Sequence, residues 1–268
     1  MDELFDERKL EVSKYAKRIG IQNKIKHLPP FKKKEQGKLT NLETAWNTGI
    51  IYSDGDLIFF GTDFTWFGPT LLGRYATLEK AHLDAKTAFV GSIMQSESPK
   101  ITDETGKITI YEKPIDELKA LETLPKRFDS RWNNMLGIIK YSFSTSNNDL
   151  TYSPAPLGLF GSSCVSLDGC LEVNGFDEAY DYGGHGFDDT DFCFRLFFAG
   201  YAFFIDPANT SLHITHDSNI MPKSGDNRNR EYFVEMLRKN QAPHNYFAQN
   251  PYDIRKLHRK RLRGEPLW

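Results

Sequence analysis

Three carboxylates stand within four positions of a segment that has the pattern of a helix start. Asp188, Asp189 and Asp191 follow the run Gly184-His185-Gly186, and an apolar helix pattern continues behind them. Like charges repel one another in a low-dielectric space, but the free amides and positive dipole end of a helix N-terminus favour anions. A carboxylate anchored in this way at a chain turn suits a general base. The alternative is ordinary charge placement at a helix end, with Asp191 and Arg195 forming an ordinary i,i+4 helix ion pair worth a few tenths of a kcal/mol.

Two histidines, His213 and His216, lie downstream on a segment with the pattern of a strand. On a regular strand they face opposite sides of the sheet. At a strand end, either one could join a metal site with a distant carboxylate. The alternative is that both are partly buried and hydrogen-bonded without a metal.

The apolar pattern around these residues predicts an α/β fold. Asp56–Phe60 is an apolar run of strand length with little alternation, which predicts a central strand buried on both faces. Ahead of it, Thr40 and Glu43 have the spacing of a capping box, which predicts a helix over 40–53. The residues expected to face inward on this helix are Leu42, Ala45, Trp46 and Ile50.

The remaining elements are expected from periodicity and from turn residues. Helices are expected over 6–19, 116–124, 168–174, 188–199, 228–239 and 252–262. Strands are expected over 24–28, 87–94, 157–167, 201–205 and 210–214, with a hairpin over 101–112.

Composition limits the class of protein. The chain has 268 residues and a formal net charge of −2, so it lacks the bulk basic field of a nucleic-acid-binding protein. Its cysteines, Cys164, Cys170 and Cys193, have no metal-type CxxC spacing, which favours a reduced, cytoplasmic setting. The first residues lack the apolar core of a signal peptide, and no apolar run reaches the roughly 18 residues of a membrane span.

Four motifs occur in order: Phe160-Gly-Ser-Ser-Cys-Val-Ser166, Val173-Asn-Gly-Phe-Asp-Glu178, Gly186-Phe-Asp-Asp-Thr-Asp191 and His213-Ile-Thr-His216. Upstream stand Thr44-Ala-Trp-Asn-Thr-Gly49 and Gly55-Asp-Leu-Ile-Phe-Phe-Gly-Thr-Asp63. Together they resemble the GT-A glycosyltransferases, most of all the family 2 enzymes and the animal β-1,4-galactosyltransferases. The resemblance covers about residues 38–80 and 157–220.

The resemblance implies a GT-A, Rossmann-like α/β fold with a mixed sheet flanked by helices. This domain is expected over residues 1–220, with a C-terminal helical extension over 221–268. Domains of this family usually begin with strands that bind the nucleotide base and end in Asp-Asp-Gly-Ser. Because the sequence starts just after that point, the domain is expected to be truncated at its N-terminus.

The implied reaction moves a sugar from a UDP- or GDP-sugar to a hydroxyl of a glycan or lipid-linked sugar, with inversion at the anomeric carbon. Asp189 matches the family's base, which deprotonates the acceptor hydroxyl. Asp188 matches the preceding acidic residue, which usually binds the acceptor. Gly161, Gly186 and Tyr182 are further residues expected at the acceptor.

The resemblance also implies a Mn²⁺ or Mg²⁺ ion that carries the donor diphosphate. Asp63 matches the last Asp of the family's DxD motif, and with Gly61 and Thr62 it forms the expected donor segment. His216 matches a late histidine that often ligates the metal, and His213 stands where the galactosyltransferases have another ligand. Gly61 replaces the first Asp of DxD, which removes a group that often helps to hold the donor ribose.

Two other classes of function are open. The chain could be a non-catalytic relic of a glycosyltransferase that binds carbohydrate or a partner enzyme, or Asp188, Asp189, His213 and His216 could form a metal-dependent hydrolase site. Aromatic residues could stack on a sugar or simply pack in the core; they are Trp66, Trp132, Tyr180 and Tyr182. The basic run Arg255–Arg263 is expected to be a solvated helix face, with peripheral contact to an anionic membrane as the alternative.

Overall fold

A computed structural model describes residues 5–20, 22–29, 31, 37, 41–61, 65–68, 70–81, 86–96, 150–153, 156, 162–184, 186–214, 228–240 and 246–267. The contacts divide the chain into two compact units. Unit 1 comprises Met1–Asp56, Leu167–Ala199 and Met221–Trp268, and unit 2 comprises Leu57–Ser166 and Gly200–Ile220. The expected hairpin over 101–112, the helix over 116–124 and Trp132 lie outside the described residues.

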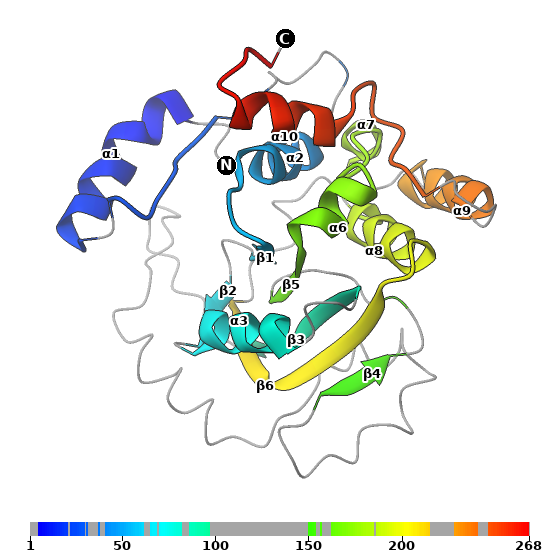
Figure 1. Ribbon diagram of the computed structural model, residues 1–268, viewed down its shortest axis with the longest axis horizontal. Coiled ribbons are helices and arrows are strands. Elements are labelled where there is room, and N and C mark those ends of the chain that lie inside the picture. The colour runs from blue at the N-terminus through cyan, green and yellow to red at the C-terminus, as the bar shows by residue number, and fades with distance from the viewer. Residues whose placement is uncertain are drawn as a thin grey trace, which may run out of the picture. The chain divides into compact units, whose positions relative to one another are not determined.

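Unit 2 contains a six-stranded sheet (Figure 1). Its strands are β1 (Leu57–Phe60), β2 (Thr65–Phe67), β3 (Thr87–Ser96), β4 (Thr151–Ser153), β5 (Ser163–Ser166) and β6 (Ala202–Ile214). They lie in the order β1-β5-β3-β6-β2, and β4 also pairs with β6. The β3–β6 pair is parallel and the other pairs are antiparallel. The expected α/β class with a mixed sheet is therefore confirmed.

The helix α3 (Leu71–Ala81) packs on this sheet and builds the core of unit 2. Leu71, Tyr75, Phe89 and Cys164 are buried together there. The Tyr75 hydroxyl donates a hydrogen bond of 2.6 Å to the Ser162 carbonyl. Burying this ring therefore leaves no unsatisfied hydroxyl.

The position of β1 contradicts the expected central strand. It stands at the end of the strand order and pairs with β5 among the described strands. Leu57, Ile58 and Phe59 are only half-buried. The apolar run was misleading because apolar side chains on an end strand can pack on a neighbouring helix, here α3, as well as between two layers.

The strand expected over 24–28 is wrong, and two other expected strands are confirmed as parts of one longer strand. Residues 25–28 are described without strand pairing, and the exposed Lys24 and Lys26 offer no apolar face to a sheet. The strands expected over 201–205 and 210–214 are one continuous strand, β6. Its register against β3 shifts between Gly91 and Ser92, so the break in the sequence pattern marks an irregularity rather than a strand end.

Unit 1 is helical. Its helices are α1 (Phe5–Arg18), α2 (Leu42–Tyr52), α6 (Leu167–Glu172), α7 (Tyr180–Gly183), α8 (Asp188–Phe198), α9 (Arg228–Asn240) and α10 (Ile254–Leu262). α2 contacts α6, α7 and α10, and α8 packs on α9. The expected helices over 6–19, 40–53, 168–174, 188–199, 228–239 and 252–262 are confirmed within a few residues. The domain boundary expected at residue 220 stays a prediction.

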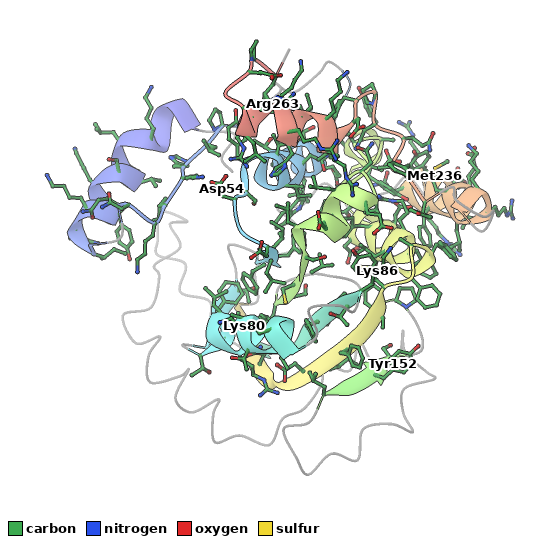
Figure 2. The ribbon with its side chains drawn as sticks, viewed as in Figure 1. Asp54, Lys80, Lys86, Tyr152, Met236 and Arg263 are labelled. Atoms are coloured by element: carbon green, nitrogen blue, oxygen red, sulfur yellow. The ribbon has the colours of Figure 1, made fainter. Side chains whose placement is uncertain are left out.

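The basic helix α10 is fixed to the end of α2. Asp253 caps α10 by accepting a hydrogen bond of 3.0 Å from the Lys256 amide. Asp54, labelled in Figure 2, forms ion pairs with Arg261 of α10 and with Lys26. The Lys26 and Arg261 hydrogen bonds lower the pKa of Asp54 to about 2. Part of the basic run is thus paired within the chain.

None of the helices in the described part of the chain combines the length and the apolar character that crossing a bilayer requires. The three cysteines are free and buried.

Candidate functional site

The turn over 173–178 is held from several sides. Asn174 and Gly175 adopt φ of 61° and 66°. The Asn47 side chain of α2 accepts from the Phe176 amide at 2.8 Å and donates to the Phe176 carbonyl at 2.9 Å. The Asn250 amide donates to the Asn174 and Phe176 carbonyls at 2.9 and 2.8 Å. Two side chains far away in sequence therefore fix the backbone of this turn.

The buried face of α2 differs from the expected one. The helix buries Glu43, Thr44, Asn47 and Thr48 together with Ile50 and Ile51, whereas Leu42, Ala45 and Trp46 are half-buried. The expected inward face is therefore wrong except at Ile50. The reason is that α2 turns hydrogen-bonding side chains towards the 173–181 segment, where Asn47 bonds the Phe176 backbone and Thr44 bonds the Asp181 carboxylate.

The cap of α2 also differs. Asn41 is the N-cap residue and its side chain makes no capping bond. Instead, the Asp181 carboxylate of α7 accepts from the Glu43 amide at 3.4 Å and from the Thr44 hydroxyl at 3.2 Å. An acidic residue more than one hundred positions away thus takes the role expected of a local capping box; Thr40 lies outside the described residues.

Arg195 of α8 also holds the turn over 173–178. It is 1% exposed and donates from Nε to Asp191 at 2.7 Å. Its Nη1 donates to the Val173 and Gly175 carbonyls, each at 2.7 Å. Burial raises the pKa of Asp191 although the Arg195 charge opposes the shift. The expected i,i+4 ion pair of Asp191 and Arg195 is therefore present, and it is buried and joins α8 to the turn.

The loop between α7 and α8 depends on Asn229 of α9. Its amide donates to the carbonyls of Tyr180, Gly184 and Gly186 at 3.3, 3.1 and 3.1 Å. A Cβ on Gly183 would lie 1.8 Å from Asn229 Oδ1, so this position has room only for glycine. Asn229 therefore sets the path of the chain into the acidic start of α8.

At that start, the two candidate carboxylates differ in environment. Asp188 is 2% exposed, and its Oδ2 has no hydrogen-bond partner among the described residues. Asp189 is half-buried, and the Thr190 hydroxyl donates to it at 3.2 Å. Asp189 is thus the member of the pair that solvent reaches more readily.

Three buried carboxyl groups interact with one another near the start of α8. Glu43, Asp181 and Asp188 are each at most 2% exposed. Burial raises the pKa of Glu43 well above its usual range, helped by its hydrogen bond with Asp181 and by repulsion from Asp188. Burial, and then repulsion from Asp189, raise the pKa of Asp188 to about 7, against a smaller opposing effect of backbone amides. Folding therefore favours the protonated forms of Glu43 and Asp188.

The acidic cluster gives unit 1 a stability that depends on pH. The folded-state pKa of Asp188 is about 7 and its ordinary value is 3.8. Because folding favours the protonated form, the free energy of unfolding should fall as pH rises from about 4 to about 7 and level off above that. Asparagine at position 188 stays neutral at every pH. Asp188→Asn should therefore remove this change in the free energy of unfolding, which is on the order of a few kcal/mol.

Urea unfolding of the wild type and of Asp188→Asn at about pH 5 and about pH 8 measures that difference. Asp168→Asn, at an exposed position of α6, is the matched control and should keep the wild-type pH dependence. Identical pH profiles for the wild type and Asp188→Asn would contradict the placement of Asp188.

The donor side of the expected site belongs to unit 2 and is described in part. Asp63, Thr62, Gly161 and His216 lie outside the described residues. His213 lies on β6, where its backbone pairs with Thr65 of β2. Within the residues that the structure describes, no group of three or more His, Cys, Asp or Glu side chains could hold a metal ion.

The side chains around Gly61 leave little room for the first Asp of the DxD pattern. A Cβ at Gly61 would lie 2.6 Å from Phe67 Cζ and 2.9 Å from Phe59 Cε1. These two rings contact each other edge-on, with centroids 5.0 Å apart. An aspartate therefore has no room at this position unless the rings move.

The aromatic candidates separate into core and surface residues. Tyr180 is fully buried, which fits core packing, while Tyr182 is 41% exposed. The side chain of Trp66 lies outside the described part of the structure. Gly186, with φ 109°, lies in the loop that Asn229 holds.

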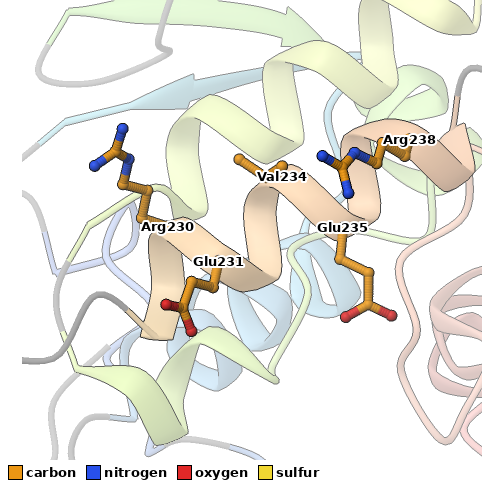
Figure 3. Close-up of a pocket in the computed structure, with 5 residues that line it drawn as sticks. All are labelled: Arg230, Glu231, Val234, Glu235 and Arg238. Atoms are coloured by element: carbon orange, nitrogen blue, oxygen red, sulfur yellow. The ribbon is translucent and has the colours of Figure 1, made fainter.

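A pocket of about 500 Å³ lies on α9 (Figure 3). Arg230, Glu231, Val234, Glu235 and Arg238 line it. None of the residues expected at the active site is among them.

Solved structures similar to this chain include a glycosyltransferase. No family model matches the chain, and no curated protein matches it in sequence. The solved structure of GalNAc-T7 with UDP, GalNAc and Mn²⁺ is similar over 92% of this chain, with 13% identity and a TM-score of 0.47. This chain covers 45% of that one, less than half its length. We therefore base the function proposed below on the residues of this chain.

Proposed function

We propose that this chain is an inverting, metal-dependent glycosyltransferase of the GT-A type. The observation that carries the proposal is the start of α8. There the half-buried Asp189 follows the buried Asp188, on a loop and turn that Asn229, Asn47 and Arg195 hold in place. A carboxylate on such a rigid support suits a positioned base.

In the proposed reaction, Asp189 accepts the proton of an acceptor hydroxyl. The hydroxyl oxygen then forms a bond to the anomeric carbon of the donor sugar, and the bond from that carbon to the diphosphate oxygen breaks. The nucleoside diphosphate leaves with the electron pair. No second carboxylate is assigned as a nucleophile, so one displacement inverts the anomeric carbon.

The other roles follow from the family resemblance. Asp63, His216 and His213 would hold a Mn²⁺ or Mg²⁺ ion, which offsets the charge on the leaving diphosphate. Gly61 and Thr62 would lie beside the donor, a UDP- or GDP-sugar. Asp188, Gly161, Gly186 and Tyr182 would contact the acceptor, a glycan or lipid-linked sugar. The exposed part of Arg255–Arg263 would touch an anionic membrane surface if the acceptor is lipid-linked.

Release of nucleoside diphosphate from a panel of UDP- and GDP-sugars, with Mn²⁺ and glycoside acceptors, tests the proposal. We expect release that requires both the donor sugar and an acceptor. Hydrolysis of p-nitrophenyl phosphate with metal alone would favour the hydrolase alternative. Saturable sugar binding without diphosphate release would favour the non-catalytic relic.

A further inference from the structure

Phe187 has an unusual backbone conformation for its residue type. It is the N-cap residue of α8 and lies in the left-handed region, with φ 68° and ψ −11°. Asn174 is the other described non-glycine residue with positive φ. Asparagine tolerates this region, whereas a phenylalanine there is strained. The left-handed residue directly before Asp188 is therefore a bulky aromatic one.

The ring of Phe187 is exposed and supported at the same time. It is 38% exposed. It stacks on Phe233 of α9 with centroids 5.6 Å apart and an interplanar angle of 28°. Phe233 in turn contacts Phe194 of α8 edge-on at 5.5 Å. Two helices thus hold the ring in a fixed place while part of its surface stays open to solvent.

The location of this ring indicates its ligand. Phe187 stands two residues before Asp189, and the Asn229 side chain fixes the loop that leads to both. An aromatic face attracts the C–H groups of a pyranose ring, which carry partial positive charge, as it attracts other positive edges. A sugar stacked on Phe187 would present its hydroxyls to the neighbouring carboxylate.

We propose that Phe187 is a stacking platform for a pyranose ring of the acceptor. The proposal rests on the function proposed above and deepens it: the acceptor would be a glycoside with an apolar sugar face next to its reacting hydroxyl. In this proposal, the left-handed backbone of Phe187 places its ring next to Asp188 and Asp189.

Two substitutions and a matched control test the platform. Phe187→Gly removes the ring and suits the left-handed backbone, so the protein should fold with an unfolding midpoint near that of the wild type. Phe187→Trp keeps an aromatic face. Phe247→Ala removes another exposed phenylalanine of unit 1, which is 48% exposed and stacks on Tyr246.

Binding is measured by saturation-transfer NMR on the full chain, with the methyl β-glycosides of glucose, galactose and N-acetylglucosamine as probes. We expect the wild type, Phe187→Trp and Phe247→Ala to bind at least one of them alike, and Phe187→Gly to bind it about tenfold more weakly. A wild type that binds none of the three, or a Phe187→Gly variant that binds as the wild type does, would overturn the platform.

The outcomes for platform and transferase are separable. Sugar binding that depends on Phe187, in a chain that turns over no sugar nucleotide, would retain the platform and refute the transferase. Turnover with an unchanged acceptor KM in Phe187→Gly would retain the transferase and refute the platform.

Discussion

Arg195→Met is expected to lower the free energy of unfolding by about 3–5 kcal/mol, because it leaves the buried Asp191 without its counter-charge. It also removes the donor to the Val173 and Gly175 carbonyls, which are bonded at 2.7 Å in the wild type. Methionine has a similar length, so packing is largely preserved. Urea unfolding followed by circular dichroism measures the loss.

The chain offers a matched control for this change. Lys239 and Glu235 of α9 form another i,i+4 ion pair, but their side chains are 51% and 61% exposed. Lys239→Met should therefore cost at most about 1 kcal/mol. The double change Arg195→Met with Asp191→Leu should recover part of the loss, since no buried charge then remains unpaired. Equal costs for Arg195→Met and Lys239→Met would show that the Arg195 pair does not hold the turn.

Asp189→Asn is expected to lower turnover by about 10²–10⁴-fold, the usual contribution of a positioned base. The amide keeps the shape of the side chain and loses its basicity. Donor KM should change little, because the carboxylate is assigned to the acceptor. Steady-state kinetics with saturating acceptor, together with an unfolding midpoint, separates the loss of the base from a loss of folded protein.

Asp168→Asn serves as the control for Asp189→Asn, because it removes an exposed carboxylate from the first turn of α6 in the same unit. Its turnover should equal that of the wild type. If Asp189→Asn also turned over sugar at the wild-type rate, Asp189 would not be the base.

The helices of unit 1, except the short α7, were predictable because their signals are local. Apolar periodicity and the glycines that follow some of the helices fall within one stretch of sequence, as at Gly20 after α1 and Gly200 after α8. The face that α2 buries was not predictable. Asn47 and Thr44 are buried because they bond Phe176 and Asp181, and these partners are 129 and 137 positions away.

The positions of the strands in the sheet also depend on contacts between residues that are distant in sequence. The apolar run at Leu57–Phe60 predicted a strand correctly, but its place at the end of the sheet depends on pairing with β5, more than one hundred residues later. The irregularity in β6 looked like a break because a strand irregularity and a strand end both interrupt alternation.

At the candidate site, the motif around Asp188 and Asp189 predicted the start of α8 and singled out both carboxylates as candidates. It did not reveal Glu43, Asp181 or Asn229, whose roles depend on contacts across unit 1. Phe187 was missed because its sequence signal is weak. That signal is an aromatic residue at a position where a glycine would suit the turn before the helix.

The most direct test of the central claim is the anomeric configuration of the product. The wild type is incubated with an α-linked sugar nucleotide, Mn²⁺ and a glycoside acceptor, and the new linkage is assigned by proton NMR. A single displacement assisted by Asp189 predicts a β-linked product. An α-linked product, or release of free sugar without transfer to the acceptor, would contradict it.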